Sequence, residues 1–233
     1  MKKVLVLGGL LVLAAVILIG VFFSSPIRSM GRNAMLGKWF LNHDSAWMMK
    51  ANSRCADAPF SFPTNGYVGF IWDDSFRPGH RHQGIDVFGG QPSGEEPVYA
   101  AYDGYLTRLP DWISTVIIRV PDDPLQPGRQ IWTYYTHMAS SSGDSFIAAD
   151  FPPGTYEMPV KAGDLLGYQG NYSGTPGNPT GIHLHFSIIR SDDEGKFLNE
   201  LAIANTVDPS PYFGLRLNAE SNKSSVPLCG MDE

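Results

Sequence analysis

Gly181-Ile182-His183-Leu184-His185-Phe186 is the stretch from which the fold of this chain can be worked out. Histidines alternate with apolar residues, which predicts a strand with both imidazoles on one face, because successive strand side chains point to opposite faces. The chain has six histidines, so two on one short strand indicate a chemical site. A strand with its polar face in solvent explains the pair equally well when the pair is taken alone.

The surrounding sequence predicts an all-β domain. Between Cys55 and Leu217, short β-branched and aromatic runs are separated by Gly, Pro, Asn and Asp, as expected for many short strands. The clearest expected strands cover residues 97–101, 115–120, 130–135 and 183–189. About 160 residues are enough for one core, and no repeat divides them.

An apolar run opens the chain. No charged residue occurs from Val4 to Phe23, behind Lys2 and Lys3, and about twenty such residues can cross the ~30 Å hydrocarbon core of a membrane as a helix. A cleaved signal peptide is the alternative, but its apolar region spans only ~7–15 residues and ends at a small-residue cleavage site, which Ser24-Ser25-Pro26 matches poorly. We therefore expect residues 1–23 to be a transmembrane anchor.

The remaining chain divides by composition. Residues 24–54 are expected to be a connector, partly helical around residues 35–41, which could lie at the membrane surface or pack as a short helix. Residues 55–217 form the predicted domain, and residues 218–233 form a polar C-terminal tail. A Ser-, Gly- and Pro-rich insertion covers residues 140–158.

Charges and cysteines bear on location and partners. Basic residues flank both sides of the apolar run, so charge leaves its orientation open. Cys55 and Cys229 are expected to form one disulfide that ties the tail to the core, which favours the extracytoplasmic side; the alternative is two unrelated thiols. Setting aside Lys2 and Lys3 leaves 15 basic residues of 17 against 23 acidic ones, a net charge of −8. This charge speaks against nucleic acid as a partner, and the sequence does not indicate an oligomeric state.

A second histidine motif indicates a metal site. His82 and Asp86 lie four positions apart, and on a straight strand their Cα atoms would be ~13 Å apart at ~3.3 Å per residue, too far to share one ion. The chain must therefore bend between them, and we expect Gly84 to supply the backbone freedom. Joined to His185, the pair gives two histidines and one carboxylate, the pattern of a catalytic zinc with an open fourth position. His137 and His183 remain as candidates to transfer protons or stabilise an oxyanion.

These motifs resemble the M23 family of zinc endopeptidases, the LytM and lysostaphin type that cut peptidoglycan cross-bridges. His82-Gln83-Gly84-Ile85-Asp86 is similar to the family's His-x-Gly-x-Asp element, and Tyr135-Thr136-His137-Met138 to its Tyr-x-His-Leu element. Gly181–Phe186 is similar to its His-Leu-His-Phe element. The resemblance implies a mainly antiparallel sheet that forms a groove, Zn²⁺ bound by His82, Asp86 and His185, and catalytic roles for His137 and His183.

The resemblance covers roughly residues 63–189 and includes two framework elements, at residues 97–104 and 160–167. Three departures concern the groove. Ser187 stands where many members have Glu, the insertion 140–158 is long, and the loop 171–180 is expanded. We expect all three to lie at the groove walls. His80 could replace His82 at the metal, but the family spacing favours His82.

The expected function is zinc-dependent hydrolysis of peptide bonds in peptidoglycan cross-links or stem peptides. The expected location is a single-pass anchor with the domain outside the cytoplasm, or secretion if the apolar run is cleaved. The alternatives are a non-catalytic LytM-like scaffold that binds cell wall or activates another hydrolase, a zinc D-Ala-D-Ala peptidase of another family, and an anchored binding module without a metal. Substrate and bond are implied by the resemblance alone.

Overall fold

The computed structural model describes residues 31–74 and 79–230. Residues 31–42 are helical. The following elements are, in chain order, η1 (Ser45–Trp47), β1 (Met48–Met49), β2 (Gly66–Phe70), β3 (Ile85–Phe88), β4 (Pro97–Tyr99), β5 (Gly104–Thr107), β6 (Val116–Val120), β7 (Ile131–Thr136), β8 (Met158–Val160), β9 (Leu165–Tyr168), β10 (Leu184–Arg190), η2 (Ile203–Asn205), β11 (Thr206–Val207) and α2 (Ser210–Phe213).

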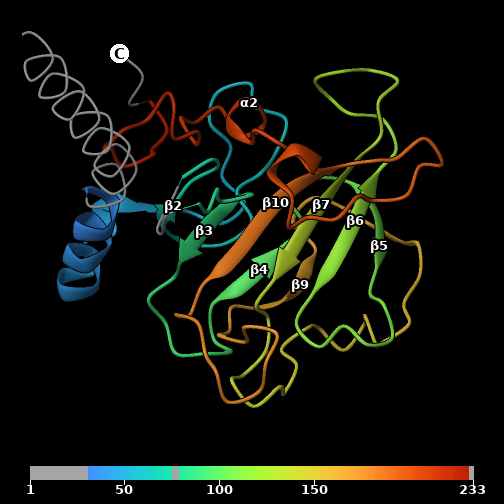
Figure 1. Ribbon diagram of the computed structural model, residues 1–233, viewed down its shortest axis with the longest axis horizontal. Helices are drawn as coiled ribbons and strands as arrows, with labels where there is room; N and C mark the ends of the chain where they lie inside the picture. The colour runs from blue at the N-terminus through green and yellow to red at the C-terminus, as the bar shows by residue number, and fades with distance from the viewer. Residues whose placement is uncertain (1–30, 75–78, 231–233) are drawn as a thin grey trace, which may run out of the picture.

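A nine-stranded antiparallel sheet organises the described residues (Figure 1). Its strand order is β1-β2-β3-β10-β7-β6-β5-β8, and β11 pairs with β10 outside this path. A smaller antiparallel sheet joins β4 and β9. The predicted all-β class with antiparallel pairing is confirmed, and each of the four clearest expected strands is present as β4, β6, β7 or β10, with bounds that differ by at most two residues.

The two faces of the large sheet differ in composition, as alternation along β10 predicts. Leu184, Phe186 and Ile188 point into the main apolar core, where they meet Ile85 and Tyr135 of the neighbouring strands. The intervening residues of β10 face the other side. Since a one-residue slip in register would exchange these faces, burial of the apolar set holds the histidines on the opposite face.

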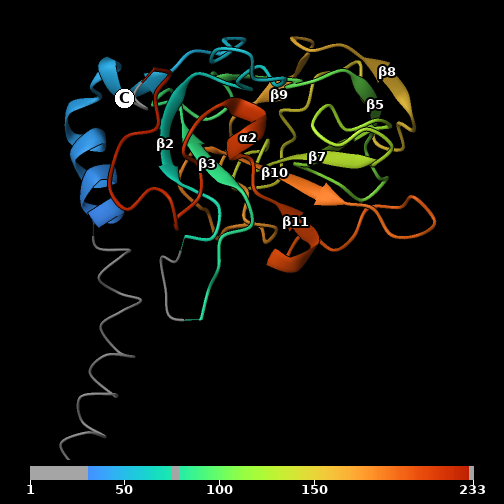
Figure 2. The same cartoon turned by 90° about the horizontal axis from the view of Figure 1, so that it is seen from above.

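The helix 31–42 packs on the β2–β3 end of the sheet. Both views show it there, drawn in blue (Figures 1 and 2). Trp39 is 1% exposed and stacks on Tyr67 of β2, with ring centroids 5.6 Å apart. At the register shift in β2, a Cβ on Gly69 would lie 3.0 Å from Leu36 Cδ1 and 2.6 Å from the Phe88 ring. The missing side chain therefore lets the helix approach the strands.

The C-terminal tail holds this helix from outside. The buried guanidinium of Arg32 forms an ion pair with Asp74, with Nε 3.3 Å from Oδ2, and donates a hydrogen bond of 2.9 Å to the Asn222 carbonyl oxygen. Cys55 and Cys229 form a disulfide, which confirms the predicted bridge. The helix, the tail and the start of the domain thus make one packed corner of the molecule.

No helix within residues 31–74 and 79–230 is long and apolar enough to cross a membrane. The predicted anchor at residues 1–23 lies outside the described residues, and so does the first part of the predicted connector. The division into an anchor, a connector, a domain and a tail stays a prediction.

One buried arginine helps to attach the insertion 140–158. Arg108 donates hydrogen bonds to the Phe151 carbonyl oxygen at 2.8 Å, to Ser145 Oγ at 3.0 Å and to the Trp112 carbonyl oxygen at 3.0 Å. These hydrogen bonds offset the free-energy cost of burying the charged guanidinium of Arg108. They tie the insertion to the loop that follows β5.

Candidate metal centre and groove

Neighbouring strands place the predicted site residues in one row across the sheet. His185 of β10 lies opposite Asp86 of β3 on one side and opposite Thr136 of β7 on the other. Phe70 of β2 lies opposite Asp86 in turn. Directly opposite side chains in a sheet begin ~4.5–5.5 Å apart, so the register brings Asp86 and His185 together across a separation of 99 positions.

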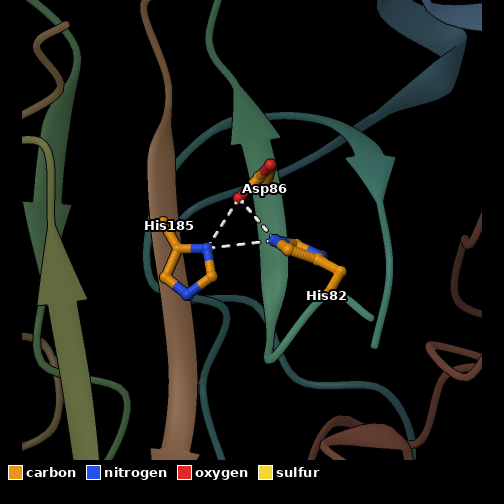
Figure 3. Close-up of side chains that lie close together, drawn as sticks. All are labelled: His82, Asp86 and His185. Carbon is orange, nitrogen blue, oxygen red and sulfur yellow. Dashed lines mark hydrogen bonds and ion pairs between the residues drawn. The ribbon is translucent and has the colours of Figure 1, made fainter. Parts of the chain in front are cut away.

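His82, Asp86 and His185 form a buried group that could hold a metal ion (Figure 3). Asp86 Oδ1 lies 2.8 Å from His185 Nδ1 and 3.1 Å from His82 Nε2, and the two nitrogens are 3.1 Å apart. Donor atoms that share one tetrahedral ion at ~2.0–2.1 Å lie ~3.3 Å from one another. The three residues therefore fit one ion with little movement, and they leave a fourth coordination position to other atoms.

The predicted bend between His82 and Asp86 is present, and it is located at Gly84. The φ of Gly84 is not among the positive values of the described residues. A Cβ at this position would also lie 2.0 Å from the Phe186 carbonyl oxygen. Gly84 therefore also supplies room for close approach to β10.

Hydrogen bonds set which ring nitrogen each histidine offers. His82 donates from Nδ1 to the Ile71 carbonyl oxygen at 3.1 Å, which leaves Nε2 for a metal. His185 donates from Nε2 to Glu200 Oε1 at 2.9 Å, which leaves Nδ1. Such outer partners orient a metal-binding imidazole and fix its tautomer. The nitrogens left over are the two that face Asp86.

Glu200 was missed by the sequence interpretation. It lies in the loop between β10 and β11, 15 positions after His185, and nothing in its local sequence marks it as functional. Ser187, which shares the His185 face of β10, also donates to Glu200 Oε1 at 3.3 Å. The short Ser187, two positions after His185, was the one available signal, since it leaves a place for a carboxylate beside His185.

His137 and His183 lie next to the metal group with their rings 4.6 Å apart. His137 donates from Nδ1 to the Tyr172 carbonyl oxygen at 2.6 Å, and His183 from Nδ1 to the Gly181 carbonyl oxygen at 2.7 Å. Each ring therefore keeps Nε2 free of a proton, and His183 Nε2 lies 3.6 Å from Asp86 Oδ1. His137 also has φ of 74°, a conformation rare for a residue with a side chain, which sites of function often hold.

Burial and neighbouring charge push the ionisable groups of the metal-free site in opposite directions. Burial, with the neighbouring His183 and His185, lowers the pKa of His137 to about 3, and burial lowers the pKa of His183. Burial alone would also lower the pKa of His185, but hydrogen bonds to Asp86 and Glu200 raise it to about 10. The site thus contains two neutral imidazoles, those of His137 and His183, and one strongly basic imidazole, that of His185.

A groove of about 860 Å³ contains the metal group and both further histidines. The helix 31–42 lines one end of it with Asn33, Leu36 and Phe40, and the Phe40 ring meets Phe88 edge to face at 5.5 Å. Trp112 and Tyr172 line it elsewhere. The predicted groove is present, and a segment expected to be a connector supplies part of its wall.

Of the three departures expected at the groove walls, which are Ser187, the insertion and the expanded loop, only the loop lines the groove among the described residues. The expanded loop contributes Tyr172, Ser173, Gly174 and Thr180 to the lining. The insertion 140–158 supplies no residue of this lining. It lies against the expanded loop instead, since the Gly177 N–H donates a 2.9 Å hydrogen bond to the Ser141 carbonyl oxygen.

His80 is outside the metal group. Its ring centroid lies 6.3 Å from that of His82, roughly stacked, and the group of three that could hold an ion contains His82 instead. This placement agrees with the family spacing that favours His82.

Comparisons with known proteins gave structural similarity only. No family model matches the chain, and no curated protein matches it. Similar solved structures include Csd3 of Helicobacter pylori, with 19% identity over 65% of this chain and 39% of that one, at a TM-score of 0.39. The catalytic domain of the prophage-encoded M23 protein EnpA of Enterococcus faecalis has 22% identity over 64% of this chain and 94% of that one, at a TM-score of 0.36.

A third structure is named for LytM, a glycyl-glycine endopeptidase, from Ruminococcus gnavus. It is 25% identical over 59% of this chain and 47% of that one, with a TM-score of 0.37. This chain thus spans less than half the length of two of the three proteins. M23 and LytM structures are among those that this chain resembles, as its motifs indicated. With TM-scores below 0.5, these similarities establish no activity.

Proposed function

We propose that this protein is a zinc-dependent endopeptidase that hydrolyses peptide bonds in peptidoglycan cross-links or stem peptides. The observation that carries the proposal is the convergence of His82, Asp86 and His185 within 3.1 Å of one another at the floor of a groove. The M23 resemblance of the motifs supports the substrate class. A scaffold without catalysis would not need this complete set beside two neutral histidines.

Zinc bound there would lower the pKa of a water and polarise the scissile carbonyl. His137 and His183 present unprotonated Nε2 atoms, so either can accept the proton of the attacking water. Once protonated, the same imidazole can stabilise the developing oxyanion or donate its proton to the departing amine. The carbonyl oxygens of Tyr172 and Gly181 hold the rings in place, because they accept from the Nδ1 atoms.

The groove composition bears on the substrate. Its lining includes Asp86, Asp111 and Glu200 and contains no Lys or Arg among the described residues. Apolar walls from Phe40, Phe88 and Trp112 suit a peptide with small or apolar side chains near the scissile bond. We therefore expect neutral or amine-bearing peptides to be cut faster than those with carboxylates at these positions.

The test is hydrolysis of purified peptidoglycan fragments by the full chain, before and after zinc removal and after zinc is restored. Mass spectrometry of the products identifies the bond. The proposal expects cleavage that disappears with the metal and returns with it. Unchanged cleavage by zinc-free protein would contradict the metal mechanism, and zinc binding without cleavage would support a scaffold role instead.

We also propose that the domain lies outside the cytoplasm, on an anchor formed by residues 1–23 or after cleavage of that run. The Cys55–Cys229 disulfide supports this location, because such bonds persist in oxidising compartments. In intact cells, a protease added from outside should degrade the domain while cytoplasmic proteins survive. Protection until the cells are lysed would overturn this placement.

A further inference from the structure

The loop carboxylate of Glu200 lies on the far side of His185 from the metal group. Its Oε1 accepts a 2.9 Å hydrogen bond from His185 Nε2, while His185 Nδ1 faces Asp86 and His82. Glu200 therefore binds the edge of the imidazole opposite the proposed ion and is not placed to be a ligand of that ion. It contacts the metal group through the His185 imidazole.

The surroundings hold this carboxylate in one place. The side chain of Glu200 is 12% exposed and that of His185 is 10% exposed. Ser187 Oγ donates to the same oxygen at 3.3 Å. The next residue, Leu201, accepts a hydrogen bond from Gln83 Nε2 at its carbonyl oxygen at 2.9 Å. The loop is thus fastened to the segment that carries His82.

His185 and His82 differ in their outer partners. His82 donates to a backbone carbonyl oxygen, which no substitution removes. His185 donates to a side chain, so its orientation and basicity depend on one residue. A carboxylate partner makes an imidazole a stronger metal ligand and holds its ring in the binding orientation.

We propose that Glu200 is a positioning residue for the metal centre, which fixes His185 with Nδ1 toward the ion and raises the affinity of the site for zinc. Ser187 makes this arrangement possible, because it shares the His185 face of β10 and is short enough to leave room for a carboxylate from the loop. The loop between β10 and β11 thus supplies the carboxylate that a longer acidic residue at position 187 could supply from the strand. This inference rests on the proposed zinc function.

The test uses the full chain, purified in mild detergent, and compares the wild type with E200A and E200Q. The matched control is E194A, because Glu194 lies in the same loop with its side chain 73% exposed and pairs only with Lys196 in the described contacts. Zinc affinity is measured by competition with a chelator of known affinity. Removal of such outer partners costs about 10–100-fold in metal affinity, so E200A should weaken zinc binding at least about tenfold.

E200Q keeps an acceptor but loses the charge, so its affinity should fall between the wild type and E200A, while E194A should match the wild type. Proton and nitrogen NMR of the zinc-loaded chain should show a strongly downfield His185 Nε2–H signal that moves upfield in E200A. Thermal melting of each zinc-free variant checks that it folds. If E200A does not fold, the zinc affinity and the His185 Nε2–H signal of E200Q test the proposal instead.

The outcomes separate this inference from the proposed function. Wild-type zinc binding with unchanged affinity and an unchanged Nε2–H signal in the Glu200 variants would overturn the positioning role alone. A wild-type chain that binds no zinc would overturn both. Zinc binding that depends on Glu200 without any peptide cleavage would uphold the inference and contradict the enzyme.

Discussion

At the scale of single residues, the site depends on which nitrogen each imidazole presents. His82 offers Nε2 and His185 offers Nδ1, and in each case the opposite nitrogen donates to a fixed oxygen. His137 and His183 both donate from Nδ1 and keep Nε2 for protons. In each of the four histidines, the oxygen that accepts from one ring nitrogen thus sets which nitrogen is left available.

The first prediction at this scale concerns the choice between His82 and His80. H82A should lose zinc, because it removes one of three donor atoms that converge within 3.1 Å. H80A should keep it, because His80 lies outside that group. Inductively coupled plasma measurement of bound zinc in dialysed protein checks this. Comparable loss in the two variants would contradict the assignment.

The second prediction concerns proton transfer. H137N and H183A should retain zinc but lower kcat by about 10²–10⁴-fold, the usual contribution of a general acid or base. Asn is chosen at position 137 because it tolerates the positive φ of His137 better than Ala does. Kinetics of peptide cleavage on zinc-loaded protein give the result. A fall in zinc content that parallels the fall in rate would instead make either residue a ligand.

At the scale of elements, the helix 31–42 is part of the domain. Leu36 and Phe40 line the groove while Trp39 fills a separate apolar cluster against β2 and β3. The helix therefore contributes both to the stability of this corner and to the shape of the groove. A fragment that begins at Cys55 would lack this wall and expose Tyr67 and Phe88.

W39A should accordingly cost about 3–5 kcal/mol of unfolding free energy, as large-to-small changes of buried Trp do. F40A is the matched control, because Phe40 is 44% exposed and its loss leaves a smaller gap in the packing. Urea denaturation of each variant gives the difference. Equal stabilities would show that the packing of Trp39 contributes little.

The strand β7 carries a pH-dependent contribution to stability. The hydroxyl of Tyr135 is buried and accepts a 2.9 Å hydrogen bond from the Ala101 N–H. Burial raises the pKa of Tyr135 from 10 to about 12. A folded-state pKa above the unfolded value means that the stabilisation is fully present below pH 10 and is lost as pH rises from 10 to 12.

The unfolding free energy should therefore fall over that range by roughly 3 kcal/mol on account of this group, since each pKa unit corresponds to about 1.36 kcal/mol. Y135F removes the ionisable hydroxyl. Between pH 10 and 12, the unfolding free energy of this variant should therefore fall less steeply with pH than that of the wild type, by the contribution of one proton. Denaturant titrations between pH 9 and 12 measure both slopes. Parallel slopes would rule out Tyr135 as the titrating group.

At the scale of the whole molecule, one covalent link ties the C-terminal tail to the start of the predicted domain. The Cys55–Cys229 disulfide spans 174 positions, and the tail that it holds also packs on the helix through Arg32 and Asn222. The variant with both C55S and C229S should lose about 2–5 kcal/mol of stability. Thermal melting with and without reductant compares this variant with the wild type. A wild type that melts alike under both conditions would contradict a stabilising role.

Much of this arrangement was predictable from the sequence. Alternation along residues 183–189 predicted β10 with its two faces, because side-chain direction in a strand follows from local geometry. The donor set of His82, Asp86 and His185 was predictable from residue chemistry and motif spacing. Their convergence within 3.1 Å agrees with that interpretation.

Other features depend on contacts that no local pattern records. Glu200 reaches His185 from a loop, Gly84 makes room for the Phe186 carbonyl oxygen, and the helix 31–42 forms a groove wall. The insertion 140–158 was expected at the groove walls, but it supplies no lining residue and packs against the expanded loop, through a hydrogen bond from Gly177 to Ser141.

The sequence by itself determined the strand class, the alternation of faces and the residues of the candidate metal group, since these follow from residue type and from periodicity over a few positions. Only the tertiary structure decided which loop supplies the outer carboxylate, which segment lines the groove and which glycine must lack a side chain. The physical reason is that these contacts join distant parts of the chain. Their partners are chosen by sheet register and by the packing of whole elements.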